Sequence, residues 1–490
     1  MAIRALLVAL LVAVMAGACA WRQPDAELSL LYNAAAQHHS PDRNPIIAIP
    51  GIMGSRLLDV PSGVSAWGAF GKGAVNPAAP DGARLIALPI RDEKLAELRD
   101  DVAPAGVLEK VRLELVGIPL EIQAYAGILA TLGVGGYRDE ALGLAGEVDY
   151  GENHFTCFQF AYDWRRDNVE SARELRDYIL DKREYVRSEY RKRFGVDDPN
   201  VRFDIATHSM GGLVTRYFLM YGGQDLPADG SLPELTWEGA DLVERVILIG
   251  TPNAGSAVAF RDLVEGTRLG PFLPYYSPAL MGSFPSVYQL LPRPRHRSIV
   301  WDDDPNRPVD TLDPEIWARM GWGLAAPDEA GMLEMLMPEV GSEEERRRIS
   351  LRLQRRMLER AAAFMRALDR PARLPPHVRL YLVAGDAEPT LERISVSSAD
   401  GRIEAGASGI GDGTVLRSSV LLDERVGNEW EPRLVTPLDF HAALFLPSGH
   451  LGVTRNEVFR DNVLFWLLED PGGPARNGTG SLTGASQPRR

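Results

Sequence analysis

The sequence is poor in cysteine, and its basic residues do not outnumber its acidic ones. Cys19 and Cys157 are the only cysteines among 490 residues, so no disulfide framework can form, and Cys157 is expected to be a lone buried thiol. The formal net charge of −14 argues against nucleic acid as a partner and against electrostatic binding to an anionic membrane. Any contact with lipid must therefore be mainly apolar.

Long hydrophobic runs are also scarce, and the conspicuous one, from Ala5 to Ala16, lies at the start of the chain. It is too short to predict a membrane span. The short start with Arg4 before it and the small residues up to Ala18 after it are typical of a cleaved export signal. The small residues before Cys19 also resemble a bacterial lipoprotein box. We therefore expect an exported protein, secreted or in the cell envelope, and we favour lipidation of Cys19.

The chain is organised around Val201–Tyr217, where an apolar, strand-like run stops at Ser209 and small residues begin a helix. This is the pattern of a nucleophile elbow, in which a tight turn lifts the serine hydroxyl off the sheet. The N–H of Met210 then points at the same spot and can hold an oxyanion. The full pattern is G-x-S-x-G, and Thr207 stands in place of its first glycine.

A second loop has the composition to approach the same spot. Ile46–Ile49 predicts a short strand that ends in Pro50-Gly51-Ile52-Met53-Gly54-Ser55, whose glycines let the backbone come close to a ligand. The N–H of Ile52 is the candidate for a second oxyanion donor. Further on, Gly63–Gly82 is rich in Gly, Ala and Pro, which fits a flap over the substrate or a plain surface loop. Trp67 in this stretch is the candidate substrate contact.

Predicted strands alternate with predicted helices, which indicates an α/β fold with a mostly parallel sheet. Further strands are predicted at Thr156–Tyr162, Val243–Ile249 and Val378–Ala384. One long helix is predicted after the first of these strands and ends at about Phe194, and two more are predicted over Ser342–Arg370 and Thr454–Leu468. The expected domains are a signal peptide over 1–18, a tether over 19–44, an α/β core over 45–256, a cap over 257–341, the rest of the core over 342–470 and a disordered tail over 471–490. The Met- and aromatic-rich cap fits either a surface that closes over an acyl chain or ordinary core.

A serine nucleophile needs a histidine to take its proton. In hydrolases with this elbow the histidine follows the serine in sequence, which leaves His296, His377, His441 and His450. Arginines flank His296 and oppose its protonation, and His377 begins a strand. His441 and His450 remain, and we favour His450 because it lies in a loop just before the last helix.

The histidine in turn needs a carboxylate to orient it. Asp386 directly follows the strand Val378–Ala384, which is the generic place for this residue. Asp412 lies between two glycines, in a sequence typical of a tight exposed turn. On spacing alone the two aspartates compete closely.

Taken together, these motifs resemble the lecithin:cholesterol acyltransferase-like family of α/β hydrolases, which includes acyltransferases and phospholipases. The resemblance rests on matches in order to Pro50-Gly51-Ile52-Met53-Gly54-Ser55, Ala161-Tyr162-Asp163-Trp164-Arg165, His208-Ser209-Met210-Gly211-Gly212, Gly250-Thr251-Pro252 with Gly255-Ser256, Gly411-Asp412-Gly413-Thr414-Val415 and His450-Leu451. It implies an α/β-hydrolase fold with an inserted cap. It also favours Asp412 over Asp386 and His450 over His441.

The resemblance implies a serine enzyme that hydrolyses lipid acyl esters or transfers their acyl group to an alcohol. Ser209 would form an acyl-enzyme, with His450 as base and Asp412 as its orienting acid, and no metal or cofactor is needed. The expected partners are lipid acyl esters, an acceptor alcohol or water, and a membrane or lipid surface. A general carboxylesterase or triacylglycerol lipase is an alternative, and so is a non-catalytic, lipid-binding envelope lipoprotein.

Overall fold

The computed structural model describes residues 27–69, 75–108, 110–115, 118–123, 125–197, 199–268, 274–425 and 431–470. The expected signal peptide over 1–18, the expected lipidation site Cys19 and the expected tail over 471–490 lie outside these ranges.

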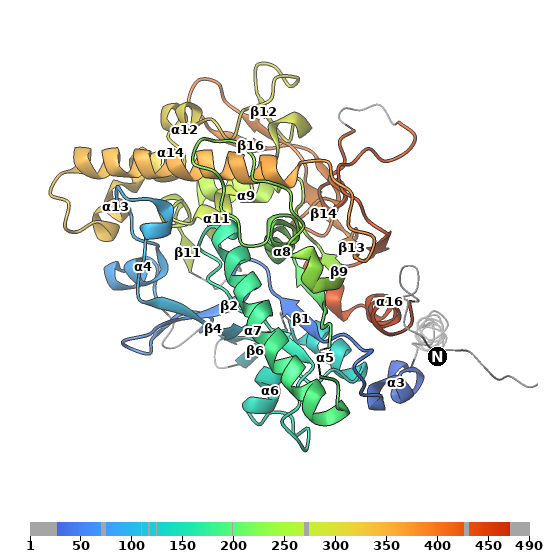
Figure 1. Ribbon diagram of the computed structural model, residues 1–490. Coiled ribbons are helices and arrows are strands. Elements are labelled where there is room, and N and C mark those ends of the chain that lie inside the picture. The colour runs from blue at the N-terminus through green and yellow to red at the C-terminus, as the bar shows by residue number, and fades with distance from the viewer. Residues whose placement is uncertain are drawn as a thin grey trace, which may run out of the picture.

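A six-stranded sheet lies at the centre, and each of its strands runs parallel to its neighbours (Figure 1). In spatial order the strands are β18 (Ala442–Leu446), β13 (Arg379–Gly385), β9 (Val243–Ile249), β8 (Phe203–His208), β1 (Ile46–Ile49) and β7 (Cys157–Gln159). β1 and β8 are buried along their whole length, because helices cover both faces of the sheet. The predicted α/β class with a mostly parallel sheet is confirmed.

Two hydrophobic clusters hold helices on opposite faces of this sheet. One face packs against α7 (Asn168–Phe194) and α8 (Met210–Tyr221), and the other against α5 (Ala126–Val134) and α16 (Glu457–Leu468). The side chain of Asp167 caps α7 by accepting the N–H of Val169. Every residue of α8 is buried, so the helix that follows Ser209 is fixed on all sides.

The region between β9 and β13 builds a second layer, seen in yellow and orange in Figure 1. Its elements are α9 (Ala257–Glu265), β10 (Thr267–Arg268), β11 (Tyr275–Tyr276), α10 (Pro278–Met281), α11 (Pro285–Tyr288), β12 (Ile299–Trp301), α12 (Pro314–Met320), α13 (Ala330–Leu336) and α14 (Glu343–Leu368). Proline starts α10, α11 and α12, a position where its missing N–H costs nothing. Apart from α14, these helices are short, so the region carries no extended helical periodicity in its sequence. Among the helices of the described ranges, none combines the length and apolar composition needed to cross a bilayer.

Smaller sheets, antiparallel except for the parallel pair of β12 with β15, and short helices lie around the core. They are β2 (Ser55–Asp59) with β3 (Ser65–Trp67) and β4 (Val102–Val107), the pair β5 (Lys110–Leu115) and β6 (Ile118–Gln123), β14 (Glu388–Leu391) with β17 (Ser408–Gly411), β15 (Ile394–Val396) with β12 and β16 (Ile403–Ala405), and the helices α4 (Pro80–Ile86), α6 (Glu140–Leu144) and α15 (Arg417–Val420). The stretch 63–82, expected to be a loop or flap, therefore contains β3 and the start of α4.

The described part of the expected tether, residues 27–44, differs from a loosely packed arm. It contains α2 (Leu28–Leu31) and α3 (Asn33–Gln37), and Leu28 and Tyr32 are buried against Leu464 of α16. Residues four apart lie on one face of a helical turn, so this spacing gives the arm a buried side.

Candidate active site

Ser209 lies at the turn between β8 and α8. Its backbone has φ 53° and ψ −128°, a conformation that non-glycine residues rarely adopt and that often marks functional sites. Its N–H donates to the carbonyl of Ile249 on the next strand at 2.8 Å. A Cβ at Gly212 would lie 2.0 Å from Thr251 Oγ1, so only glycine at this position lets α8 pack this closely against Thr251. The elbow predicted from the sequence is therefore present.

The structure brings Ser209, His450 and Asp412 into one hydrogen-bonded line. His450 Nε2 lies 3.0 Å from Ser209 Oγ, and His450 Nδ1 lies 2.8 Å from Asp412 Oδ2. Ser209 follows β8, Asp412 follows β17, and His450 lies in the loop between β18 and α16. A base within hydrogen-bond reach of a serine, itself held by a carboxylate, is the arrangement that activates a serine hydroxyl.

Asp412 is held in its ionised form. Asp412 is only 2% exposed, and its second carboxylate oxygen, Oδ1, accepts the N–H groups of Thr414 at 3.0 Å and Val415 at 2.7 Å. Burial by itself raises the pKa of Asp412, but His450 and the two amides outweigh it and leave the pKa below its usual value. An ionised Asp412 fixes the ring of His450 with its proton on Nδ1.

The competing residues have other partners. Asp386 Oδ2 lies 3.7 Å from the guanidinium of Arg417. His441 directly precedes β18, and its Nδ1 accepts the N–H of Leu380 at 3.3 Å, so it lies at the amino end of the strand, opposite the edge that carries Ser209. His296 Nε2 lies 3.1 Å from a carboxylate oxygen of Glu424.

The loop from Pro50 to Ser55 touches Ser209. A Cβ at Gly51 would lie 2.6 Å from Ser209 Cβ, so no other residue fits there without a shift. Ile52 lies between β1 and β2, outside any strand, and Met210 is the first residue of α8, so neither N–H is needed by a sheet or helix. Both N–H groups therefore stay candidate oxyanion donors, Met210 directly after Ser209 in sequence and Ile52 directly after Gly51.

Two aromatic residues of the Ala161–Arg165 motif hold this loop. The Tyr162 hydroxyl donates to the carbonyl of Pro50 at 3.1 Å, and the Trp164 indole N–H donates to the carbonyl of Ser55 at 3.2 Å. The Tyr162 N–H also donates to Ser55 Oγ at 3.1 Å. The motif therefore holds the Pro50–Ser55 loop, which we call the oxyanion loop because it contains the candidate donor Ile52.

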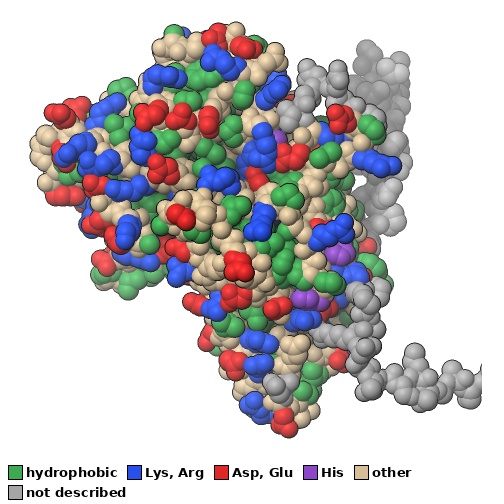
Figure 2. Space-filling view, turned by 45° about the horizontal axis from the view of Figure 1, so that its top comes forward, with side chains coloured by type: hydrophobic (Ala, Val, Ile, Leu, Met, Phe, Trp, Pro, Cys, Tyr) green, Lys and Arg blue, Asp and Glu red, His purple; other side chains and the backbone are tan. Residues whose placement is uncertain are grey.

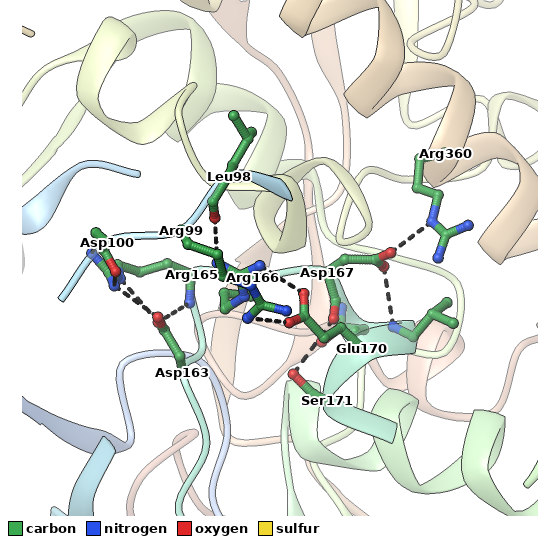
Figure 3. Close-up of polar contacts among 12 residues, drawn as sticks. Leu98, Arg99, Asp100, Asp163, Arg165, Arg166, Asp167, Glu170, Ser171 and Arg360 are labelled. Carbon is green, nitrogen blue, oxygen red and sulfur yellow. Dashed lines mark hydrogen bonds and ion pairs between the residues drawn. The ribbon is translucent and has the colours of Figure 1, made fainter. Parts of the chain in front are cut away.

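A cluster of ion pairs holds Asp163 and Arg165 of the Ala161–Arg165 motif (Figure 3). The fully buried guanidinium of Arg165 binds the carboxylates of Asp163 at 2.7 Å and Asp100 at 2.8 Å. Asp167 binds Arg360 of α14 at 2.6 Å and also accepts the side-chain amide of Gln289 at 2.6 Å. Buried charges are tolerated because each is paired, and the cluster locks the core to the second layer.

Trp67 is not placed as expected for a substrate contact. It is only 4% exposed, its indole N–H donates to the Met53 carbonyl at 2.8 Å, and its ring packs edge-on against Trp164 and Tyr276. These contacts make it a support of the oxyanion loop. An aromatic residue in a Gly-rich stretch gives the same local sequence signal whether it faces solvent or core.

The site also contains two residues that sequence reasoning did not single out, Tyr125 and His208. His208 directly precedes Ser209 within the elbow, which is a usable signal, whereas nothing in the local sequence around Tyr125 points to the site. In the described part of the chain, no group of three or more His, Cys, Asp or Glu side chains is arranged to hold a metal ion.

The family model described as lecithin:cholesterol acyltransferase matches residues 144–322, a segment that includes Ser209, and the predicted resemblance is confirmed over that segment. No curated protein matches the chain. A chain of the crystal structure described as the Tle4-Tli4 complex is 15% identical, with a TM-score of 0.53 and coverage of 87% of this chain and 98% of that chain. EstA from Clostridium botulinum is 12% identical, with a TM-score of 0.33 and coverage of 88% of each chain.

Together with the parallel sheet and the elbow, the first of these likenesses shows the α/β-hydrolase fold. The family match supports an enzyme that acts on lipid acyl esters by hydrolysis or by acyl transfer.

Gly51→Ala is expected to lower kcat by about 100-fold, because the added Cβ pushes the oxyanion loop away from Ser209 and one oxyanion donor is displaced. KM should change little, and the variant should still fold with a lower melting temperature, because the added Cβ overpacks a buried site. Gly133→Ala is the matched control, since a Cβ there meets nothing within 4 Å. Kinetics on a soluble ester check the prediction, and wild-type kcat in Gly51→Ala would contradict it.

Proposed function

We propose that the protein is a serine-dependent lipid acyl-ester enzyme, a phospholipase or O-acyltransferase that works through an acyl-enzyme on Ser209. The observation that carries the proposal is the line of Asp412, His450 and Ser209 at 2.8 and 3.0 Å, with the serine on a strained elbow beside the oxyanion loop.

In the proposed reaction, Ser209 Oγ attacks the ester carbonyl carbon while His450 Nε2 takes its proton. The carbonyl oxygen becomes an oxyanion, which the N–H groups of Met210 and Ile52 stabilise. Asp412 stabilises the charged imidazolium. As the carbon–oxygen bond to the leaving alcohol breaks, His450 gives the proton to that alcohol, and the acyl group stays on Ser209.

The second half of the reaction repeats these steps with a new nucleophile. His450 takes a proton from water or from an acceptor alcohol, whose oxygen attacks the acyl-enzyme, and Ser209 leaves with the proton. Water gives a free fatty acid, and an alcohol gives a new ester. The product depends on which nucleophile reaches the acyl-enzyme in the correct geometry.

We further propose that the enzyme is exported and acts at a lipid surface of the cell envelope. Export and lipidation of Cys19 are supported by the sequence of Met1–Cys19 alone. Figure 2 shows basic and acidic side chains interspersed over one face of the molecule, and the net charge is −14. Binding to lipid through such a surface must rely on apolar contact rather than on charge.

The proposed function is tested with vesicles of phosphatidylcholine plus a long-chain alcohol, by measuring free fatty acid and new ester together. Ester formation that Ser209→Ala abolishes identifies an acyltransferase, and Ser209-dependent fatty acid alone identifies a phospholipase. Activity confined to soluble esters would point to a general carboxylesterase. Lipid binding without any product would point to a non-catalytic scaffold, and either of these last two results contradicts the proposal.

A further inference from the structure

A second line of hydrogen bonds runs behind Ser209, from the oxyanion loop to the main chain of His450. The Gly51 N–H donates to the Tyr125 hydroxyl at 2.8 Å. The Tyr125 hydroxyl lies 3.3 Å from His208 Nδ1, and His208 Nε2 lies 3.0 Å from the His450 carbonyl oxygen. This line joins two backbone groups, the Gly51 N–H at one end and the His450 carbonyl at the other.

The donors and acceptors in this line can be assigned from the chemistry of each group. The His450 carbonyl can only accept, so His208 Nε2 must carry a hydrogen. Burial, reinforced by the nearby His450, lowers the pKa of His208 to about 3, which keeps the ring neutral and leaves Nδ1 as an acceptor. Burial raises the pKa of Tyr125, so its hydroxyl keeps the hydrogen that it donates to Nδ1. Each donor therefore meets an acceptor.

The line lies in the core and is not screened by water. Tyr125 is 6% exposed and His208 is 4% exposed. The ring of Tyr125 also packs against the loop, since a Cβ at Gly54 would lie 2.7 Å from its hydroxyl oxygen. A hydrogen bond in such a place is costly to break, because the group left behind has no water to bond.

The two ends of the line are groups that the proposed mechanism needs in fixed positions. Gly51 packs against Ser209 and precedes the candidate oxyanion donor Ile52. The main chain of His450 is held on both sides, by His208 at its carbonyl and by the Asp412 carbonyl, which accepts the His450 N–H at 2.9 Å. The rings of His208 and His450 have centroids 4.6 Å apart, so a neutral His208 spares the charged imidazolium a repulsive neighbour.

We propose that Tyr125 and His208 are positioning residues for the reaction at Ser209, and that together they fix the oxyanion loop and the general base relative to each other. They act through Gly51 and His450 and need no contact with substrate. This inference rests on the proposed function, because it assigns the two residues to that same site.

The first test is Tyr125→Phe, which removes only the hydroxyl. kcat on a soluble ester should fall by about 10- to 100-fold with KM unchanged, since a shifted oxyanion donor weakens the transition state and not ground-state binding. Tyr137→Phe is the matched control, a buried tyrosine whose ring packs under the guanidinium of Arg43. It should keep the wild-type kcat. A fall in melting temperature alone, with kcat retained in Tyr125→Phe, would overturn the inference.

The second test asks whether the two residues act as one line. His208→Phe should lower kcat by a similar factor, and His208→Gln should recover most of it because its amide can still donate to the His450 carbonyl. The double variant Tyr125→Phe with His208→Phe should fall no further than the worse single variant, since residues in one network are not additive. Losses that multiply would show independent effects and overturn the inference.

Ser209→Ala, measured in parallel, separates the two proposals. Activity that survives in Ser209→Ala contradicts the proposed function itself. Activity that depends on Ser209 but is indifferent to Tyr125→Phe leaves the proposed function intact and removes only the role of the second line.

Discussion

Replacing Ser209 by alanine is expected to leave a folded protein whose kcat on acyl esters is lower by about a millionfold. The acyl-enzyme cannot form without the hydroxyl, and His450 then has no proton to take. Folding should be unaffected, because the side chain is small and the turn that holds it is fixed by a hydrogen bond from its own N–H to Ile249. Ester hydrolysis and thermal unfolding, measured side by side, check both parts.

The control for this variant is Ser231→Ala, which removes an exposed serine hydroxyl that donates to Asp229. It should keep the wild-type kcat. Substantial turnover by Ser209→Ala, with Ser231→Ala unchanged, would remove Ser209 from its proposed role.

Asp412→Asn should lower kcat by about 10⁴-fold in a protein that still folds. Oδ1 of residue 412 accepts the N–H groups of Thr414 and Val415, so the oxygen of an asparagine must stay at that position. Its amide nitrogen then faces His450 Nδ1 and donates to it. This places the ring hydrogen on Nε2, where it blocks the proton transfer from Ser209.

Asp386→Asn is the matched control, because it tests the other aspartate that could orient His450. Its carboxylate lies 3.7 Å from Arg417, an ion pair of little energetic weight, so kcat should stay near the wild-type value. A collapse of kcat in Asp386→Asn without loss of folding, and near-normal kcat in Asp412→Asn, would move the acid to Asp386.

The central sheet could be predicted because its strands carry local signals. β1, β8, β9 and β13 are short apolar runs that end at turn residues, and the prediction placed each of them within a few residues of its observed bounds. The small sheets outside the central one could not be predicted in this way. β12 pairs Ile299 with Ile394, and a partner so far along the chain leaves no periodic pattern in either segment.

The residues of the candidate site likewise differ in whether the local sequence points to them. Ser209 and the candidate donors are set by local sequence, because a turn between a buried strand and a Gly-rich helix start allows few alternatives. The choice between Asp386 and Asp412 needed the family resemblance, since each follows a strand. Tyr125 escaped notice because it meets His208 only in the folded chain, 83 residues away.

Trp67 shows the limit of composition as a guide. A Gly-, Ala- and Pro-rich stretch suggested a flap or a plain surface loop, but the indole is buried and its N–H donates to the Met53 carbonyl. Burial of a single side chain depends on what the rest of the chain packs over it, and here Trp164 and Tyr276 supply that cover.

The central claim, that Ser209 carries the acyl group, is tested most directly by peptide mapping with mass spectrometry after reaction with a long-chain fluorophosphonate, which phosphonylates activated serines. We expect one equivalent of label on Ser209, complete loss of esterase activity in the labelled protein, slower labelling in the presence of substrate vesicles and no label on Ser209→Ala. Label on another residue, or full activity in protein labelled at Ser209, would contradict the account.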